Sequence, residues 1–235
     1  MIPKIIHYCW FGRNPLPASA QKCIASWRRF LPDYEIKEWN EDNFDVSIIP
    51  YTQQAYEAKK YAFVSDYARF WILYHYGGLY FDTDVEVIKS FDDIVEKGAF
   101  MGLEIDGTKK DSKIAINPGL GIGAEVGLPI YQEILDGFAK LKFYDANGKR
   151  NNYTMIPMVT ELFLLRGLIA NGQIQQLYGI TIYPQCFFNP YNSINGKLQL
   201  ASETHSIHWY SATWMEPKRV YFVKIKRLIR KILSV

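Results

Sequence analysis

The chain has 235 residues, of which 49% are hydrophobic and 22% are charged. This length and composition are typical of one globular domain with a sizeable core, and they exclude a disordered, collagen-like or coiled-coil chain. The three cysteines, Cys9, Cys23 and Cys186, show neither the C-x-x-C spacing of a zinc site nor the even number of a disulfide set. They favour a reducing compartment.

The positive charge is concentrated at the end of the chain. Seven Lys and Arg residues follow the last acidic residue, Glu216, and the rest of the chain has 20 basic and 24 acidic residues. The bulk of the protein is therefore not a nucleic-acid-binding surface. The N-terminus lacks the pattern of a signal peptide, and no stretch approaches the ~20 apolar residues of a membrane span, so we expect a cytoplasmic protein.

Strand and helix patterns alternate in the first ninety residues. In chain order, we predict a strand at residues 4–10, a helix at 19–30, a strand at 34–39, a helical stretch at 52–76 and a strand at 79–88. The long helix ends at Gly77-Gly78, because glycine is the usual residue after a helix C-terminus. This order is typical of an α/β fold.

Patterns in the second half are weaker. We predict a short helix at residues 91–97, a strand at 99–104, a glycine-rich loop at 117–127, helices at 129–141 and 157–171, a strand near 180–183, and a strand or loop at 205–210. Within the glycine-rich loop, Gly119, Gly121 and Ala124 fit the spacing of a dinucleotide-binding fingerprint. We interpret them as an ordinary turn, because no clear strand precedes them and no βαβ unit frames them.

Two acids, Asp82 and Asp84, lie in the middle of the predicted strand at 79–88. Side chains two apart in a strand share a face, so these carboxylates would project together and repel each other. A divalent cation such as Mg²⁺ or Mn²⁺ would relieve that repulsion and leave coordination sites for phosphate. The alternative is a pair of solvated acids at a strand end, because a D-x-D triplet is common by chance.

A second polar pair lies on the preceding helix. Asp66 and Arg69 are three residues apart, so they share a helix face and can act together as hydrogen-bonding groups toward a polyol. The alternative is a plain surface salt bridge. The tight Gly77-Gly78 turn brings the helix end close to the strand start, which favours a compact polar site between them.

Several short motifs together resemble one enzyme family. They are IPKIIHYCWFG at residues 2–12, SW at 26–27, LPDYE at 31–35, YAFVSDYARF and YHYGGLYFDTDVE up to residue 86, and T-x-x-x-H at Thr204 and His208, with Trp214 after it. They cover most of the chain and look like the DXD-containing glycosyltransferases of family thirty-two, which include fungal α-mannosyltransferases and bacterial capsule and lipopolysaccharide sugar transferases. The glucosyltransferase domain of large clostridial toxins has a similar core.

The resemblance implies a single GT-A-type α/β domain over residues 1–216, with a Rossmann-like mixed central sheet flanked by helices. It implies a retaining glycosyltransferase that depends on Mn²⁺ or Mg²⁺. The implied donor is a UDP-sugar that supplies a hexose or N-acetylhexosamine, and the implied acceptor is a glycan or lipid-linked oligosaccharide in capsule, exopolysaccharide or lipopolysaccharide synthesis.

The resemblance also assigns roles to the first set of residues. Asp82 and Asp84 become the DXD acids, of which the second binds the metal and the first helps hold the ribose or the metal shell. Asp66 and Arg69 match the S-D-x-x-R motif that grips the donor sugar. By this resemblance we expect these four to be the catalytic residues, and no nucleophile or base can be added to them.

Three further residues receive donor- or metal-binding roles from the resemblance. Trp10 matches the aromatic residue that stacks on uracil, and Asn40 falls where the family contacts the donor. His208 is expected to complete the metal or diphosphate site. Trp214 lies in the segment expected to close over the donor, while residues 106–156 match no motif and are expected to set acceptor specificity.

The other histidines carry weaker expectations. His7 either lines the nucleotide pocket or satisfies a backbone group, His75 packs or caps its helix, and His205 is expected to be exposed.

Residues 217–235 have the composition of a basic amphipathic helix. An apolar stripe is surrounded by lysines and arginines; it consists of Tyr221, Ile225, Leu228, Ile229 and Ile232. Such a helix binds anionic membrane surfaces, which would place the protein peripherally on the inner face of a bacterial membrane. The alternative is a terminal helix packed on the domain.

Two other functions remain open. One is a toxin-like transferase that glycosylates a protein, although the short chain lacks delivery regions. The other is a non-catalytic module that binds a nucleotide sugar or a glycan. Replacing Asp84 with Asn separates the possibilities, because a transferase should lose turnover whereas an aromatic-driven binder should keep its ligand.

Overall fold

The structure is a computed structural model that describes residues 1–151 and 153–211. Trp214 and the basic segment 217–235 lie outside the described residues, so the expectations for them, and the domain boundary at residue 216, stay predictions. Within the described ranges, no helix has the length and apolar character needed to cross a membrane.

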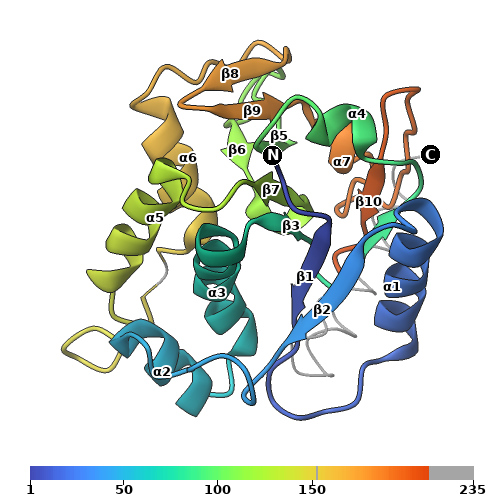
Figure 1. Cartoon of the computed structure of the whole chain (residues 1–235). Helices are drawn as coiled ribbons and strands as arrows, with labels where there is room; N and C mark the ends of the chain where they lie inside the picture. Colours follow the sequence, from blue (N-terminus) through green and yellow to red (C-terminus); the bar gives the residue numbers. More distant parts are fainter. Residues whose placement is uncertain (152, 212–235) are drawn as a thin grey trace.

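A mixed eight-stranded sheet forms the centre of the molecule (Figure 1), in the order β2-β1-β3-β7-β5-β9-β8, with β6 paired to β5. Its strands are β1 (Ile5–Cys9), β2 (Glu35–Trp39), β3 (Gly78–Tyr80), β5 (Phe100–Ile105), β6 (Ala115–Ile116), β7 (Ile122–Ala124), β8 (Gln175–Leu177) and β9 (Ile180–Tyr183). A separate antiparallel pair joins β4 (Val85–Val87) to β10 (Ser206–His208).

Five strands of the main sheet run in the same direction. β1 is parallel to β2 and β3, and β5 is parallel to β9. β7 is antiparallel to both β3 and β5, so these two blocks are parallel to each other. The carboxyl ends of the five strands therefore lie at one edge, which is where open α/β sheets bind their ligands.

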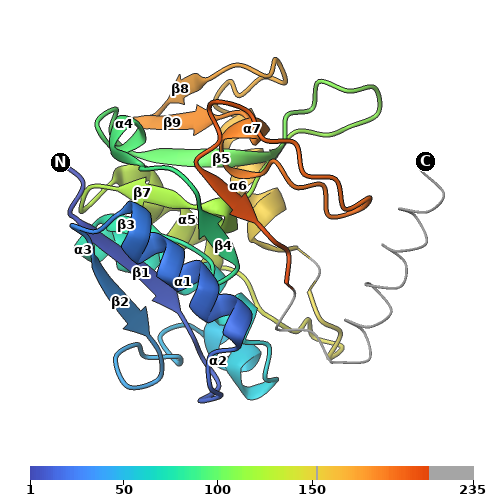
Figure 2. The same cartoon turned by 90° about the vertical axis from the view of Figure 1, so that its right-hand side faces the viewer.

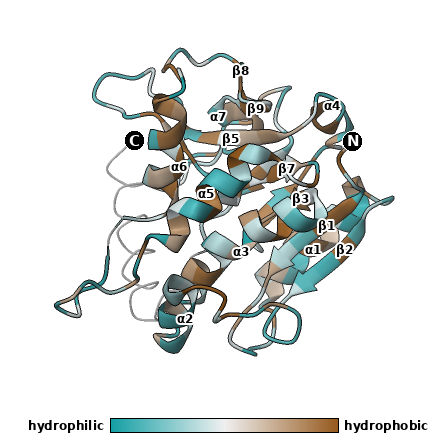
Figure 3. Cartoon of the chain, turned by 60° about the vertical axis from the view of Figure 1, so that its left-hand side comes forward, coloured by the Kyte–Doolittle hydropathy of each residue, from teal (hydrophilic) through white to brown (hydrophobic). Residues whose placement is uncertain are grey.

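Helices cover both faces of the sheet, as the side view shows (Figure 2). One face carries α2 (Pro50–Glu57), α3 (Tyr61–Tyr76), α5 (Pro129–Ala139) and α6 (Met155–Leu164); the other carries α1 (Ala18–Phe30), α4 (Asp92–Val95) and α7 (Gln185–Phe188). Each face has its own aromatic-rich core, one around Trp39 and Phe70 and the other around Trp27 and Phe91. Hydrophobic residues follow β5 and β7 behind the more hydrophilic outer side of α5 (Figure 3).

The predicted α/β class, with a mixed central sheet between helices, is confirmed. The first three predicted elements agree with β1, α1 and β2 to within one residue at each end. β5, β9, β10 and α5 are also present near their predicted positions. The strands β6, β7 and β8 were not predicted, and β7 lies in the segment expected to be a glycine-rich loop.

The single helical stretch predicted over residues 52–76 is wrong, because the structure contains two helices. α2 ends in a Schellman motif: Lys60 N–H donates to Ala55 O, Lys59 N–H donates to Tyr56 O, and Lys59 has a φ of +57°. α3 then begins at Tyr61. The predicted helix at 157–171 is also too long: α6 ends at Leu164, and Gly167 follows with a φ of +96°.

The strand predicted over residues 79–88 is also two elements. β3 ends at Tyr80, and β4 begins at Val85 and pairs with β10 rather than with the main sheet. Between them, Val85 N–H donates to Asp82 O and closes a turn. Asp82 and Asp84 therefore lie on a turn, so the argument that a strand projects them from one face does not hold.

Candidate functional site

Asp82, Asp84 and His208 bring their side chains together at the carboxyl edge of the sheet. Each offers one ligand atom, and these atoms all lie within 4.8 Å of one another. The pairing of β4 with β10 is responsible, because it aligns His208 with Val85, the residue after Asp84. We call these three residues the ligand cluster.

Asp84 and His208 form a hydrogen-bonded pair inside this cluster. His208 Nε2 lies 3.1 Å from Asp84 Oδ1, and Asp84 Oδ2 accepts a hydrogen bond from Ser211 N–H at 2.8 Å. Burial raises the pKa of Asp84, but the charge of His208 and these hydrogen bonds outweigh burial and lower the pKa below its usual value. Burial lowers the pKa of His208, but the carboxylates around it, Asp84 first, raise it above 6.5.

Arg69 backs the cluster from α3. Its side chain is only 3% exposed, and Nη2 lies 3.0 Å from Asp66 Oδ1 and 3.2 Å from Asp82 Oδ1. The guanidinium also lies over the Tyr80 ring, and Nε donates to Ser65 O at 3.0 Å. A plain surface salt bridge is therefore the wrong interpretation of the Asp66–Arg69 spacing, because the pair is buried and includes Asp82.

Arg69 and Asp66 are charged although burial disfavours the charge of both. Burial raises the pKa of the Asp66 carboxyl to about 6, and the charge of Arg69 limits that rise. For Arg69 burial acts to lower the pKa, yet Asp82, Tyr80 and Asp66 together raise it, so the guanidinium stays charged. Asp66 thus presents a carboxylate, and Asp82 a second one, on either side of a fixed cation.

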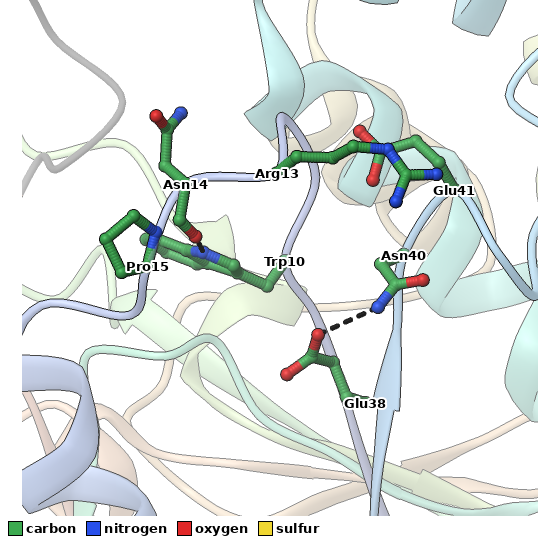
Figure 4. A pocket seen from close by; sticks show the side chains of 7 residues that line it. All are labelled: Trp10, Arg13, Asn14, Pro15, Glu38, Asn40 and Glu41. Carbon is green, nitrogen blue, oxygen red and sulfur yellow. Dashed lines mark hydrogen bonds between the residues drawn. The ribbon is translucent and has the colours of Figure 1, made fainter.

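A pocket of about 440 Å³ opens on the loops that follow β1 and β2 (Figure 4). Its lining residues are Trp10, Arg13, Asn14, Pro15, Glu38, Asn40 and Glu41. Trp10 Nε1 donates to Asn14 O at 2.6 Å, and Asn40 Nδ2 donates to Glu38 Oε1 at 2.9 Å. These bonds orient the indole ring and the amide. Trp10 and Asn40, far apart in sequence, therefore have fixed positions in the lining of one pocket.

The pocket and the ligand cluster lie on neighbouring strand ends. β1 pairs with β2 on one side and with β3 on the other, in parallel. Trp10 follows β1, Asn40 follows β2, and Asp82 lies two residues beyond β3. The sheet thus places six of the seven expected site residues of the described chain on or beside three adjacent strand ends, and β10 supplies the seventh, His208.

Sequence reasoning missed a group of polar residues beside the cluster. Glu104, near the end of β5, accepts hydrogen bonds from Tyr210 OH at 3.0 Å and from Asn117 Nδ2 at 3.1 Å. Asn117 Oδ1 accepts from Gly119 N–H in the 3-10 turn η1 (Pro118–Leu120). The glycine-rich loop predicted over 117–127 is only in part a loop, because residues 122–124 form β7 in the middle of the sheet. Gly119 lies in a turn, as interpreted, and the backbone there packs on Asp82: a Cβ at Gly119 would lie 2.3 Å from Asp82 Oδ2.

The remaining histidines have structural partners. His7 is fully buried, with Nε2 2.9 Å from Gly77 O and Nδ1 accepting from Trp39 Nε1–H at 3.0 Å, so it satisfies a backbone group. His75 Nδ1 lies 2.8 Å from Trp71 O in the last turn of α3. The expectation that His205 is exposed is wrong: it is 1% exposed, stacks on Phe187 and contacts Asp93.

Residues 17–101 match the sequence family described as the glycosyltransferase sugar-binding region containing the DXD motif. The chain is 30% identical over 111 residues to inositol phosphoceramide mannosyltransferase 1 of Schizosaccharomyces pombe, covering 43% of this chain and 33% of that protein. It is 28% identical over 169 residues to mannosyl phosphorylinositol ceramide synthase SUR1 of Saccharomyces cerevisiae, covering 68% of this chain and 38% of that protein.

One solved structure has the same fold over nearly the whole chain. It is a glycosyltransferase involved in the glycosylation of the major capsid of PBCV-1, with a TM-score of 0.53 and 14% identity over 95% of this chain and 100% of that one. This likeness concerns the fold, and it agrees with the GT-A-type fold that we predicted. The chain spans about a third of the length of the curated relatives named above. Residues 17–101, which match the DXD-containing family of glycosyltransferase sugar-binding regions, include Asn40, Asp66, Arg69, Asp82 and Asp84.

Proposed function

We propose that this chain is a metal-dependent, retaining glycosyltransferase that moves a hexose or N-acetylhexosamine from a UDP-sugar to a glycan acceptor. The observation that carries the proposal is the ligand cluster of Asp82, Asp84 and His208, backed by Arg69 and set on the same sheet edge as the Trp10 pocket. The match of residues 17–101 to the glycosyltransferase sugar-binding region supports the reaction class.

The ligand cluster fits a divalent cation by its chemistry. Two carboxylates and one imidazole are donors that Mn²⁺ accepts, and Mg²⁺ uses the carboxylates. His208 faces Asp84 with Nε2. Its Nδ1 is buried and has no hydrogen-bond partner within the described chain. When bound, the cation would offset the negative charge that develops on a diphosphate leaving group.

The residues around the cluster have separable tasks in this proposal. Arg69, held by Asp82 and by Ser65 O, fixes the Asp66 carboxylate as an acceptor for donor-sugar hydroxyls. Trp10 offers an aromatic face for the base, with its ring oriented by the bond to Asn14 O. Asn40 Nδ2 donates one hydrogen to Glu38, and among the described residues its second N–H has no acceptor, so it can donate to the donor substrate.

The acceptor and the setting of the reaction are the finer parts of the proposal. We place the acceptor among glycans and lipid-linked oligosaccharides of capsule, exopolysaccharide or lipopolysaccharide synthesis, with the protein peripheral on the cytoplasmic face of the membrane. The two curated relatives are named as an inositol phosphoceramide mannosyltransferase and a mannosyl phosphorylinositol ceramide synthase. A mannose donor therefore belongs among the sugars to be tested.

The test is release of free nucleoside diphosphate from a panel of UDP-linked hexoses and N-acetylhexosamines, with GDP-mannose included, in Mn²⁺ or in EDTA. We expect release from one donor in Mn²⁺ and none in EDTA. An Asp84→Asn variant that keeps its melting temperature but loses release would tie the activity to the cluster. Silence on the whole panel, together with no rise in melting temperature on adding UDP and Mn²⁺, would reject the proposal in favour of a non-catalytic module.

A further inference from the structure

The carboxylate of Glu104 joins two segments, each of which contacts a residue of the ligand cluster. Its Oε1 accepts from Tyr210 OH at 3.0 Å, and its Oε2 accepts from Asn117 Nδ2 at 3.1 Å. Glu104 itself is not one of the residues whose ligand atoms meet in the cluster, within the part of the chain that the structure describes.

The bond to Asn117 leads to Asp82. Because Asn117 Oδ1 accepts from Gly119 N–H at 2.8 Å, its amide nitrogen must face Glu104. The backbone of η1 is in turn packed on the Asp82–Arg69 pair: a Cβ at Gly119 would lie 2.3 Å from Asp82 Oδ2 and 3.2 Å from Arg69 Nη1. A shift of Asn117 would therefore move the turn against which the Asp82 carboxylate rests.

The bond to Tyr210 leads to His208 and Asp84. The Tyr210 ring packs edge-on against the His208 imidazole, with centroids 4.2 Å apart. Its backbone has a φ of +49°, which is costly for a residue with a side chain and needs support from its surroundings. Trp209 and Ser211, on either side, donate their N–H groups to Asp84 O and Asp84 Oδ2.

We propose that Glu104 is a positioning residue of the ligand cluster, because its two hydrogen bonds hold the η1 turn at Asp82 and the 209–211 segment at Asp84 and His208 in one arrangement. The part of this inference that concerns a metal rests on the proposed function; the hydrogen-bond path does not. The Glu104 carboxylate accepts from both neighbours. Leucine has a similar size but accepts from neither, whereas glutamine can keep both bonds, because the Tyr210 hydroxyl can accept as well as donate.

The test is Mn²⁺ affinity, measured by isothermal titration calorimetry on the full chain without any donor sugar. We expect Glu104→Leu to weaken Mn²⁺ binding about tenfold, which is the scale on which groups that orient metal ligands act. Glu104→Gln should keep most of the affinity. Its amide oxygen can accept from Asn117 Nδ2–H, and its amide nitrogen can donate to the Tyr210 hydroxyl oxygen.

Glu86→Gln is the matched control. Glu86 Oε2 accepts from Trp209 Nε1–H at 2.8 Å, and an amide oxygen accepts that bond equally well. This variant removes one negative charge beside Trp209, as Glu104→Leu removes one beside Tyr210, and should bind Mn²⁺ like the wild type. A fall in Glu86→Gln equal to that in Glu104→Leu would reduce the effect to lost charge and overturn the inference.

Two further results decide the matter. Wild-type affinity in Glu104→Leu, or a loss in Glu104→Gln as large as that in Glu104→Leu, would overturn the positioning role. If Glu104→Leu does not fold, Tyr210→Phe removes one of the two bonds, and unchanged Mn²⁺ affinity there would overturn the role as well. A wild type that binds Mn²⁺ but releases no nucleotide from any donor would reject the proposed reaction while leaving the Glu104 result to stand on its own.

Discussion

The site edge has two halves that differ in how far apart their partners lie along the chain. Around Arg69, the partners are three and thirteen residues away, at Asp66 and Asp82. Around Asp84 and Glu104, the partners Ser211 and Tyr210 lie 127 and 106 residues away. One helix and one turn are enough to build the first half, whereas the second half requires the completed sheet and the β4–β10 pair.

The largest effect on activity is expected at Asp84, in the second half. Asp84→Asn leaves the turn intact but removes the carboxylate that faces His208, so metal-dependent turnover should fall by about three orders of magnitude. Nucleotide release in Mn²⁺ measures it, and Asp136→Asn on the exposed side of α5 is the control. Substantial activity in Asp84→Asn would mean that the first half works without the second.

Arg69→Met breaks the first half from within. It leaves Asp66 and Asp82 facing each other without a cation, and removing one partner of a buried ion pair costs about 3–5 kcal/mol of unfolding free energy. Urea denaturation at pH 7 measures the change. Arg13→Met, which breaks the exposed pair with Asp42, should leave stability nearly unchanged, and an equal loss in both variants would contradict the buried role of Arg69.

Much of the first half can be predicted from the sequence, because proximity inside one element follows from its period. Asp66 and Arg69 share a face of α3, and Trp10, Asn40 and Asp82 follow parallel strands whose ends meet at one edge. Glu104 and Asn117 carry no such signal. Each is a single polar residue near a strand end, and its partner is decided by the order of strands in the sheet, which a local pattern does not contain.

The errors in the predicted elements have a related cause. The left-handed residue that follows α2 is Lys59 rather than the glycine usually found there. The sequence over 52–76 therefore has no signal of a helix end, and its pattern is that of one helix. The turn at Asp82 contains neither glycine nor proline, and β-branched and aromatic residues occur on both sides of it, from Tyr80 to Ile88. Two strands that belong to different sheets therefore resembled one.

His7 tests the stability of the strands beside the first half, because it lies in β1 and bonds Gly77 and Trp39. Burial lowers the pKa of His7 to about 4, and protonating Nδ1 would break its bond from Trp39 Nε1–H. The stability that depends on neutral His7 is complete above pH 6.5 and is lost as pH falls toward 4, a loss of about 3 kcal/mol. Urea denaturation between pH 4 and 6.5 should show a smaller pH-dependent loss of unfolding free energy for His7→Gln than for the wild type. An equal loss in the two proteins would contradict the role of neutral His7.

The smallest effect is expected at the pocket. Trp10→Ala removes one stacking surface, worth about 1–3 kcal/mol per base, so the KM for the donor should rise about tenfold with little change in kcat. Trp10→Phe keeps an aromatic face and should retain most of the affinity. Steady-state kinetics with the identified donor measure both, and a fall in kcat at unchanged KM would place Trp10 nearer the reacting atoms than the pocket does.

The bond between Ser211 N–H and Asp84 Oδ2 makes the main chain at residue 211 part of the cation site in a thermodynamic sense. The amide orients the Asp84 carboxylate and leaves other lone pairs of that group for a cation. By linkage, a change in the main chain that weakens the amide bond weakens ion binding, and ion binding strengthens the amide bond by the same factor. Hydrogen exchange at the Ser211 amide would therefore titrate with the metal, which makes one backbone proton a reporter of occupancy.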